Sequence, residues 1–149
     1  KNKKVKTDIK FEEKIALVKV YPGQDPDILD FYLKNKYKGI VIEATGLGHV
    51  PALTSRKSWI PSLKRIISRG ITVCITTQCI FGRVNPYVYS NLRALNKTGA
   101  IFLEDMLAET SFVKLGWVLG HKEWAKNKEE IRKLMLTNLA GEFSDRLEE

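Results

Sequence analysis

The sequence predicts an α/β protein, a three-layer sandwich in which a parallel sheet of about four strands is covered by helices on both faces. The first observation is that short apolar runs alternate with segments of helical periodicity. The second is that these runs are apolar at successive positions, as expected of strands buried on both sides. The third is size, because 149 residues, 44% hydrophobic and 28% charged, suit one globular domain.

The first strand is predicted at Ile15–Val20, where the run IALVKV is closed by Tyr21-Pro22-Gly23. Asp25 followed by Pro26 has the pattern of a helix N-cap with proline at the first helical position. A helix is therefore expected over 26–35. Its apolar residues recur on one face of a 3.6-residue period, namely Ile28, Leu29, Tyr32 and Leu33.

The second and third strands are predicted at Gly39–Glu43 (GIVIE) and Ile71–Thr76 (ITVCIT). The helix between them, Ser58–Arg69, is expected to end at Gly70, since glycine readily adopts the left-handed conformation that closes many helices. The second half is less regular, with a helix, a short fourth strand, a buried helix that ends at Gly120 and an amphipathic helix, predicted in that order at Tyr89–Asn96, Ala100–Leu103, Ala108–Leu119 and Asn127–Leu139.

Residues 1–13 are charged and lack apolar periodicity, so they are expected to form a linker or arm, with the folded domain at 14–149. No apolar stretch approaches the roughly 20 residues that cross a bilayer, and no charged-then-apolar leader opens the chain, which favours a cytoplasmic protein with no membrane partner. Cys74 and Cys79 have no CxxC spacing and no companion histidine pair, so reduced thiols are expected rather than zinc ligands, and no cofactor is predicted.

The net charge of +8 raises the question of nucleic-acid binding, because lysine and arginine neutralise phosphates. The lysines are nevertheless spread along the chain, and the densest cluster, KNKKVK, stands at the very start. No RRM, KH or zinc-finger pattern accompanies them. A solvated basic surface is therefore favoured over direct contact with RNA.

Two long polar loops, ATGLGHVP and TQCIFGRVNP, leave the carboxyl ends of the second and third predicted strands. Ligands of open α/β sheets bind beyond these ends, so the two loops should be neighbours and border a site. In the first loop, Gly46 and Gly48 let the backbone approach a ligand, and His49 offers a polar side chain at the rim. Turn geometry alone would explain the two glycines equally well.

The second loop carries Gln78, Arg83 and Asn85 among apolar and aromatic neighbours. These side chains are suited to holding a carboxylate or an amide. The alternative is that Arg83 merely pairs with a local acid. Ligand contact gains weight because two polar loops share one edge of the predicted sheet.

Missing motifs narrow the chemistry of this chain. The sequence has no G-x-S-x-G elbow, Walker loop, G-x-G-x-x-G fingerprint or H-E-x-x-H motif, and it has only two histidines. The second histidine, His121, follows a buried helix and is expected to face solvent. We find no assembled nucleophile and base, and therefore predict no catalytic residue and no metal site in this chain.

Five blocks of the sequence resemble, in order and spacing, the C-terminal domain of the bacterial-type L-asparaginase family: ALVKVYPGQDPDILDF, KGIVIEATGLGHVP, TTQCIFGRVNPYVYS, LEDMLAETSFVKLGWVLG and LMLTNLAGEF. They span roughly residues 14–145. The GLGH form is most similar to the D subunits of archaeal glutamyl-tRNA(Gln) amidotransferases, since ordinary asparaginases tend to show a Gly-x-Gly-Asn loop. The chain departs from this branch at Asn91-Leu92, Ala108 and Gly116, where a Thr-Gly pair, a proline and a bulkier residue are usual.

The resemblance implies a flavodoxin-like fold and a mechanism in which a threonine hydroxyl attacks the side-chain amide of glutamine or asparagine, ammonia leaves, and water releases the acid. The nucleophilic Thr-Gly-Gly-Thr stretch, a Thr-Asp pair and a catalytic lysine belong to the family's N-terminal domain, and none is in this chain. The C-terminal domain lends a loop to the active site of a neighbouring subunit. The matching loop, Thr45–His49, would border the α-amino and α-carboxyl groups of the substrate. The predicted substrate-binding residues are Thr45, Gly46, Gly48, His49, Gln78 and Arg83.

Three interpretations stay open. In the first, the chain is the C-terminal part of a glutaminase-like amidotransferase subunit that releases ammonia for Gln-tRNA(Gln) synthesis. Its partners would be an N-terminal domain or chain carrying the nucleophilic threonine, further copies in a homo-oligomer, and a tRNA-binding partner subunit. The others are a free cytoplasmic L-asparaginase and a non-catalytic assembly domain. The chain starts with lysine rather than methionine, so a piece of a longer protein is expected, inactive by itself.

Overall fold

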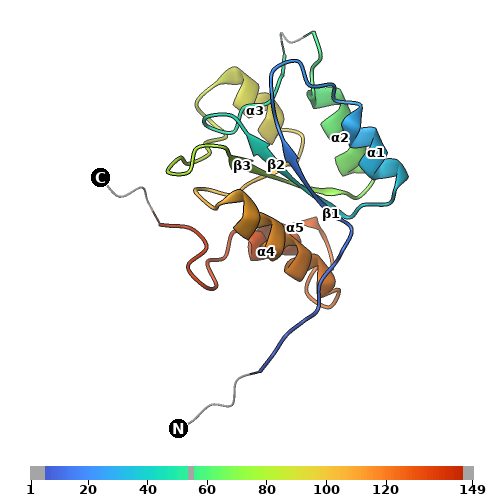
Figure 1. Cartoon of the computed structure of the whole chain (residues 1–149), viewed down its shortest axis with the longest axis vertical. Helices are drawn as coiled ribbons and strands as arrows, with labels where there is room; N and C mark the ends of the chain where they lie inside the picture. Colours follow the sequence, from blue (N-terminus) through green and yellow to red (C-terminus); the bar gives the residue numbers. More distant parts are fainter. Residues whose placement is uncertain (1–5, 54–55, 146–149) are drawn as a thin grey trace.

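The computed structural model describes residues 6–53 and 56–145, and its α/β architecture confirms the predicted class (Figure 1). Within these residues one sheet holds four parallel strands in the order β1-β2-β3-β4. The strands are β1 (Ile15–Lys19), β2 (Gly39–Ala44), β3 (Thr72–Thr77) and β4 (Ile101–Phe102). The helices are α1 (Ile28–Lys34), α2 (Ile60–Ser68), α3 (Ser90–Asn96), α4 (Ala108–Gly120) and α5 (Lys128–Met135).

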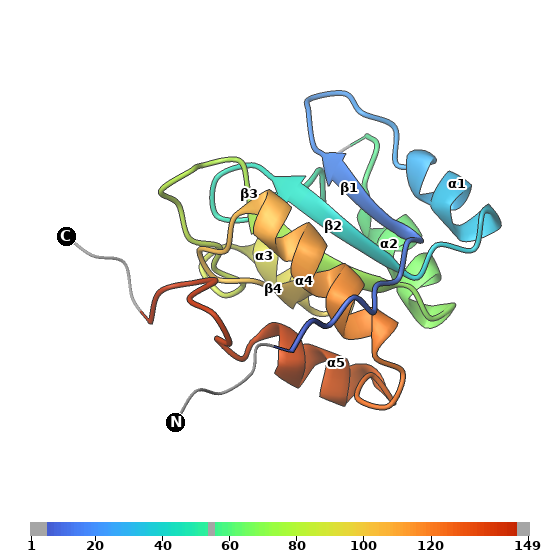
Figure 2. The same cartoon turned by 60° about the horizontal axis from the view of Figure 1, so that its bottom comes forward.

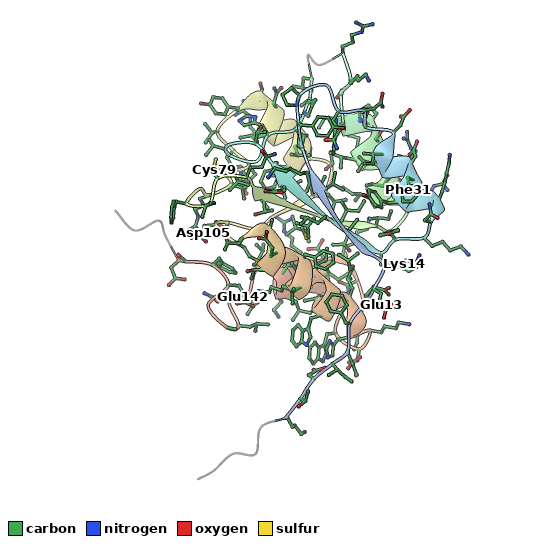
Figure 3. The ribbon with its side chains drawn as sticks, in the orientation of Figure 1. Glu13, Lys14, Phe31, Cys79, Asp105 and Glu142 are labelled. Carbon is green, nitrogen blue, oxygen red and sulfur yellow. The ribbon has the colours of Figure 1, made fainter. Side chains whose placement is uncertain are left out.

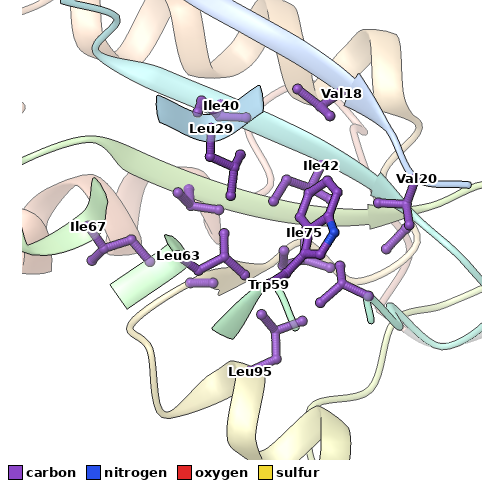
Figure 4. Close-up of a cluster of buried hydrophobic side chains, with 14 of the residues drawn as sticks. Val18, Val20, Leu29, Ile40, Ile42, Trp59, Leu63, Ile67, Ile75 and Leu95 are labelled. Carbon is purple, nitrogen blue, oxygen red and sulfur yellow. The ribbon is translucent and has the colours of Figure 1, made fainter. Parts of the chain in front are cut away.

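The three crossover helices α1, α2 and α3 cover one face of the sheet, and α4 and α5 cover the other (Figures 1 and 2). Successive side chains of a strand point to opposite faces, and β2 follows this rule. Ile40 and Ile42 join the core under the crossover helices, around Trp59 and Leu63 (Figure 4), whereas Val41 joins the second core with α4 and α5. Burial of a side chain of this size stabilises the fold by about 1.5–3 kcal/mol.

Some element ends differ from the predicted ones. The first helix starts at Ile28 and not at Pro26, because the N–H groups of Leu29 and Asp30 bond to carbonyls three residues back (both 3.0 Å), which is a tighter turn than an α-helix. The Asp25 carboxylate accepts from the Asp27 N–H (3.1 Å), as an N-cap does, and also pairs with Lys57. The fourth helix ends at Gly120, as predicted. Gly70, with φ of +94°, follows the C-cap of α2 as predicted. Among the helices of the described ranges, none has the length and apolar character to cross a membrane.

The described part of the predicted arm, 6–13, lies along the C-terminal half of α4 (Figure 2). The Glu12 N–H donates to the Gly116 carbonyl (2.9 Å), and Lys10 pairs with Glu123 (2.6 Å). The Phe11 ring covers Gly116 so closely that a Cβ there would lie 2.1 Å from the ring atom Cζ. This contact gives a physical reason for glycine at a position where the resemblance would predict a bulkier residue.

The expectation that His121 faces solvent is wrong, because its side chain is 2% exposed. Its Nδ1 lies 2.7 Å from the Trp117 carbonyl, and its Nε2 lies 2.8 Å from the Asp8 carboxylate in the arm. The ring stacks on Trp124 at a centroid distance of 3.9 Å. The arm and the turn after α4 therefore bury a histidine that the local sequence leaves exposed.

Candidate functional site

The carboxyl ends of the parallel strands meet at one edge of the sheet, and the loops after β2 and β3 lie side by side there. The Gln78 N–H donates to the Ala44 carbonyl (2.8 Å), and the Asn85 N–H donates to the Leu47 carbonyl (3.0 Å). The Thr77 hydroxyl donates to the Gly46 carbonyl (2.5 Å) and accepts from the Cys79 N–H (3.1 Å). The predicted neighbourhood of the two loops is confirmed.

The loop after β2 is a closed hairpin whose ends are Thr45 and His49. The two residues exchange backbone hydrogen bonds of 3.1 and 2.8 Å. Gly48, with φ of +103°, is buried, and a Cβ there would lie 3.1 Å from Phe102 and 3.2 Å from Ile75. Gly46, with φ of +50°, is exposed, and its added Cβ would meet no atom closer than 4.0 Å. Turn geometry and packing thus account for Gly48, whereas Gly46 leaves the hairpin tip open.

The His49 side chain is half-buried beside the hairpin. Its ring lies 5.4 Å from that of Tyr89, and no hydrogen bond of its nitrogens occurs within the described part of the chain. With Thr45, Tyr21 and Asn91 it lines a hollow of about 310 Å³. An imidazole in this position can donate to or accept from a ligand.

Gln78 braces the edge of the sheet. Its side-chain Nε2 donates to the Val20 carbonyl (2.6 Å) and to the Glu43 carbonyl (3.0 Å). Both amide hydrogens are therefore engaged, and the side-chain oxygen is the polar atom left for a ligand. The brace holds the loop after β1 against the end of β2, which fixes one wall of the hollow at His49.

Arg83 pairs with a local acid, the alternative that the sequence left open. Its guanidinium contacts the Glu104 carboxylate at 2.7 and 2.8 Å and donates to the Ser144 carbonyl (3.1 Å). Arg83 lines a second hollow, of about 430 Å³, with Leu47 and Tyr87. The structure thus brings Thr45 and His49 together in one hollow and places Arg83 in the next, on the other side of the hairpin.

Two residues of the first hollow escaped the sequence reasoning. Tyr21 follows β1 at the same edge, so the rule that singled out the other loops also applies to it. Asn91 lies on α3 and is brought to the hollow by the long connection after β3, for which the sequence carries no local signal. In the sequence, Asn91 stands out only as a departure from the family pattern.

The connection between β3 and α3 carries exposed apolar side chains. Phe81 is 93% exposed, and Ile80 and Tyr87 are exposed by 71% and 69%. Tyr87 also lines the hollow at Arg83. Figure 3 places Cys79, which neighbours Ile80 and Phe81, on the side of the molecule opposite Lys14 and Phe31. We call Ile80, Phe81 and Tyr87 the apolar rim. Large exposed apolar side chains of this kind are typical of a surface that another domain or chain covers.

Several hydroxyl and thiol groups of the described residues are engaged or buried. Threonine hydroxyls donate to backbone carbonyls, as those of Thr45, Thr76, Thr77, Thr98 and Thr137 do. Cys74 is buried, which raises the pKa of its thiol to about 12, and Cys79 is exposed. Within ranges 6–53 and 56–145 no cluster of side chains could ligate a metal ion.

The sequence of this chain is similar to part of the D subunits of glutamyl-tRNA(Gln) amidotransferases. The D subunit of the glutamyl-tRNA(Gln) amidotransferase of Pyrococcus abyssi is 55% identical over 143 residues, and that of Methanopyrus kandleri is 49% identical over 133 residues. The matches cover 96% and 89% of this chain but 31% and 27% of the relatives, so the chain spans less than a third of their length.

Solved structures share the fold. The thermostable L-asparaginase from Thermococcus kodakarensis has a TM-score of 0.81 and 30% identity over 92% of this chain and 40% of its own. L-asparaginase I from Vibrio cholerae has a TM-score of 0.75 and 27% identity over 88% of this chain and 38% of its own. The family model described as the Glutaminase/Asparaginase C-terminal domain matches residues 14–135. The chain belongs to the glutaminase/asparaginase C-terminal domain family.

Proposed function

We propose that this chain is the C-terminal part of an amidohydrolase that hydrolyses a side-chain amide, as the glutaminase-type subunit of an archaeal Glu-tRNA(Gln) amidotransferase. The ammonia released would serve Gln-tRNA(Gln) synthesis. The observation that carries the proposal is the hairpin Thr45–His49 at the carboxyl edge of the sheet, which has an open tip and an imidazole without a hydrogen-bond partner among the described residues.

The hairpin offers donors to an anionic group of the substrate. The N–H groups of Gly46 and Leu47 have no hydrogen-bond partner within the described residues, and the His49 ring lies beside them. Neighbouring N–H groups at a tip with positive φ can hold a carboxylate. In this proposal the hairpin orients the α-carboxyl and α-amino groups of glutamine or asparagine, which places the side-chain amide for attack.

The nucleophile has to come from elsewhere in the complete protein. We infer an N-terminal domain or chain that carries the reactive threonine and docks on the apolar rim, together with further copies in a homo-oligomer and a tRNA-binding partner subunit. The two amidotransferase D subunits named above support this arrangement, since the matched region is 31% and 27% of their length.

A free L-asparaginase is the second candidate, and the likeness to the asparaginase of Thermococcus kodakarensis favours it. The sequence identity to that asparaginase is 30%, whereas the identity to the amidotransferase subunit of Pyrococcus abyssi is 55%. A non-catalytic assembly domain is the third. Glutamine and asparagine hydrolysis by the complete subunit separates the three, because an amidotransferase subunit should release ammonia from glutamine in the presence of its partner and an assembly domain should release none.

The experiment that tests the site is His49→Ala in the complete subunit, with Lys122→Ala, an exposed residue far from the site, as control. Loss of one positioning contact should lower kcat/KM for glutamine roughly 10- to 100-fold with little change in melting temperature. The 149-residue chain alone should release no ammonia. Wild-type activity of His49→Ala would remove the ring from the site, and hydrolysis by the isolated chain at the rate of a complete enzyme would contradict the proposal.

A further inference from the structure

Four lysines lie in the segments that precede β1 and β2, at the amino edge of the sheet and opposite the candidate site; Figure 3 labels one of them, Lys14. Lys14 precedes β1, Lys34 ends α1, and Lys36 and Lys38 lie in the turn into β2. The Lys38 N–H donates to the Lys14 carbonyl (2.7 Å), which joins the two segments. All four side chains are exposed, and none takes part in an ion pair within the described residues. We call these four residues the basic corner.

A row of aromatic rings runs beside the basic corner. The Lys14 ammonium lies 5.2 Å from the centroid of the Tyr37 ring. Tyr37 contacts Tyr32 edge to face at 4.9 Å, and Tyr32 contacts Phe31 at 5.5 Å. Phe31, a residue that is 56% exposed, ends the row on the surface. A positive surface that carries an exposed ring can hold phosphates and stack a base.

Lys36 stands in a backbone conformation that favours glycine. Its φ is +61°, and it closes α1 through the bonds Lys36 N–H to Leu33 carbonyl (3.1 Å) and Tyr37 N–H to Tyr32 carbonyl (3.0 Å). The equivalent bonds at the end of α2 surround Gly70. A lysine at this position strains the backbone, where glycine would not. The Lys36 side chain is exposed and is not needed for packing, so the strain points to a use for its charge.

Other lysines of the chain are differently placed. Around α5, Lys122, Lys126 and Lys133 alternate with acidic residues, namely Glu123, Glu129 and Glu130, so no uniform positive field results. Among the residues directly before and after each lysine of the basic corner, Glu13 is the one acid (Figure 3). A positive field is therefore expected at this edge of the sheet.

We propose that the basic corner binds the phosphate backbone of RNA, with Phe31 as a stacking face for an unpaired base. Lysine ammonium groups act as point charges that suit phosphates spaced along a strand, and an exposed ring beside them offers a face on which a base can stack. The proposal rests on the proposed function only for the choice of a tRNA as the RNA. It assigns the two edges of the sheet to different ligands.

The first test is titration of the chain with labelled tRNA(Gln) transcript at several salt concentrations. The variant Lys34→Gln/Lys36→Gln/Lys38→Gln should lose about tenfold or more in affinity at about 0.1 M salt, and the slope of log K against log salt should fall by about 2 units, because each lost phosphate contact removes roughly 0.7 to 0.9. The matched variant Lys122→Gln/Lys126→Gln/Lys133→Gln loses the same charge and should change affinity less than about twofold.

The second test is Lys36→Gly, in which stability and binding should move in opposite directions. Glycine relieves the positive φ, so the melting temperature should rise by about 2–4 °C. RNA affinity should fall, and the salt slope should fall by nearly one unit. Phe31→Ala should weaken binding of a single-stranded oligonucleotide more than that of a duplex of equal length.

Three results would overturn the proposal: equal losses in the two triple variants, unchanged affinity of Lys36→Gly, or tighter binding of polyglutamate than of tRNA, which would indicate an acidic protein partner. These readouts need no amidase activity. A failure here leaves the proposed function standing, and a failure to hydrolyse glutamine leaves RNA binding by the corner untouched.

Discussion

Gly116 couples the arm to the domain at the scale of a single residue. Within a helix, alanine is favoured over glycine by about 0.8–1.0 kcal/mol, so Gly116→Ala would ordinarily stabilise α4. Here the added Cβ would overlap the Phe11 ring, with contacts of 2.1 and 2.3 Å. Overpacking of this kind typically costs about 1–3 kcal/mol, and the arm has to move away to relieve it.

We therefore predict that the sign of the Gly116→Ala effect depends on Phe11. In the wild type the substitution should lower the free energy of unfolding by about 1 kcal/mol, and in a Phe11→Ala background it should raise it by a similar amount. Urea unfolding of the four proteins of this double-mutant cycle measures the coupling. The same sign in both backgrounds would show that the arm does not press on Gly116 in solution.

Residues whose roles are local could be predicted from the sequence. Gly70 ends α2 for a reason that its own backbone supplies, and the hairpin at Gly48 follows from its place after a buried strand. His121 could not be placed, because its partner Asp8 lies 113 positions away along the chain. The same holds for the candidate site, where adjacency of the loops was predictable but the engagement of Gln78 with two carbonyls was not.

At the scale of elements, the segment after α5 folds back on α4 around a buried ion pair (Figure 3). Lys114 is buried, its ammonium donates to the Thr137 carbonyl (2.6 Å), and it pairs with Glu142 at 3.1 Å. The Glu142 carboxylate also accepts from the N–H groups of Leu139 (2.7 Å) and Ala140 (2.9 Å). The amphipathic pattern predicted a helix that runs to Leu139. The helix instead ends at Met135, because these contacts hold the residues that follow in another conformation.

The pKa of Glu142 makes this segment sensitive to acid. Burial alone raises the pKa of the carboxyl, but the N–H donors of Ala140 and Leu139, together with Lys114, outweigh it and bring the pKa to about 2 from an ordinary 4.5. Since the pKa is lower in the folded state, the stabilisation is fully present above about pH 4.5 and is lost as the pH falls toward about 2.

We predict that Glu142→Gln lowers the free energy of unfolding at pH 7 by about 2–3 kcal/mol, because Lys114 then keeps a buried charge without its partner. The variant should also lose less stability than the wild type between about pH 5 and pH 2. Urea titrations across this range measure both effects. Glu109→Gln, an exposed change beside the same segment, serves as control, and parallel pH profiles of wild type and Glu142→Gln would refute the assignment.

At the scale of the whole molecule, the parallel strands separate the loops at the carboxyl edge of the sheet from the turns at its amino edge. All three crossovers lie on one face, so the other face is free for α4 and α5, and the described strands never reverse their order (Figures 1 and 2). The loops that follow the strands collect at one edge, with the hairpin and the apolar rim. The turns that precede them collect at the other, with the basic corner. Periodicity predicted the layers, but it carried no signal for the exposure of the rim, whose side chains lie in an irregular connection.

The last prediction concerns association of the isolated chain through the apolar rim. Phe81 is 93% exposed, and exposed apolar side chains of this size promote self-association. We expect a dimer or larger species in sedimentation or light-scattering measurements over a wide concentration range.

The variant Ile80→Ser/Phe81→Ser/Tyr87→Ser should weaken association at least about tenfold, because each buried side chain of this size contributes about 1.5–3 kcal/mol. Leu107→Ser/Val113→Ser/Leu139→Ser removes exposed apolar side chains on and beside α4 and should have little effect. A chain that stays monomeric at high concentration, or equal weakening by both variants, would show that the rim is not the surface through which copies meet.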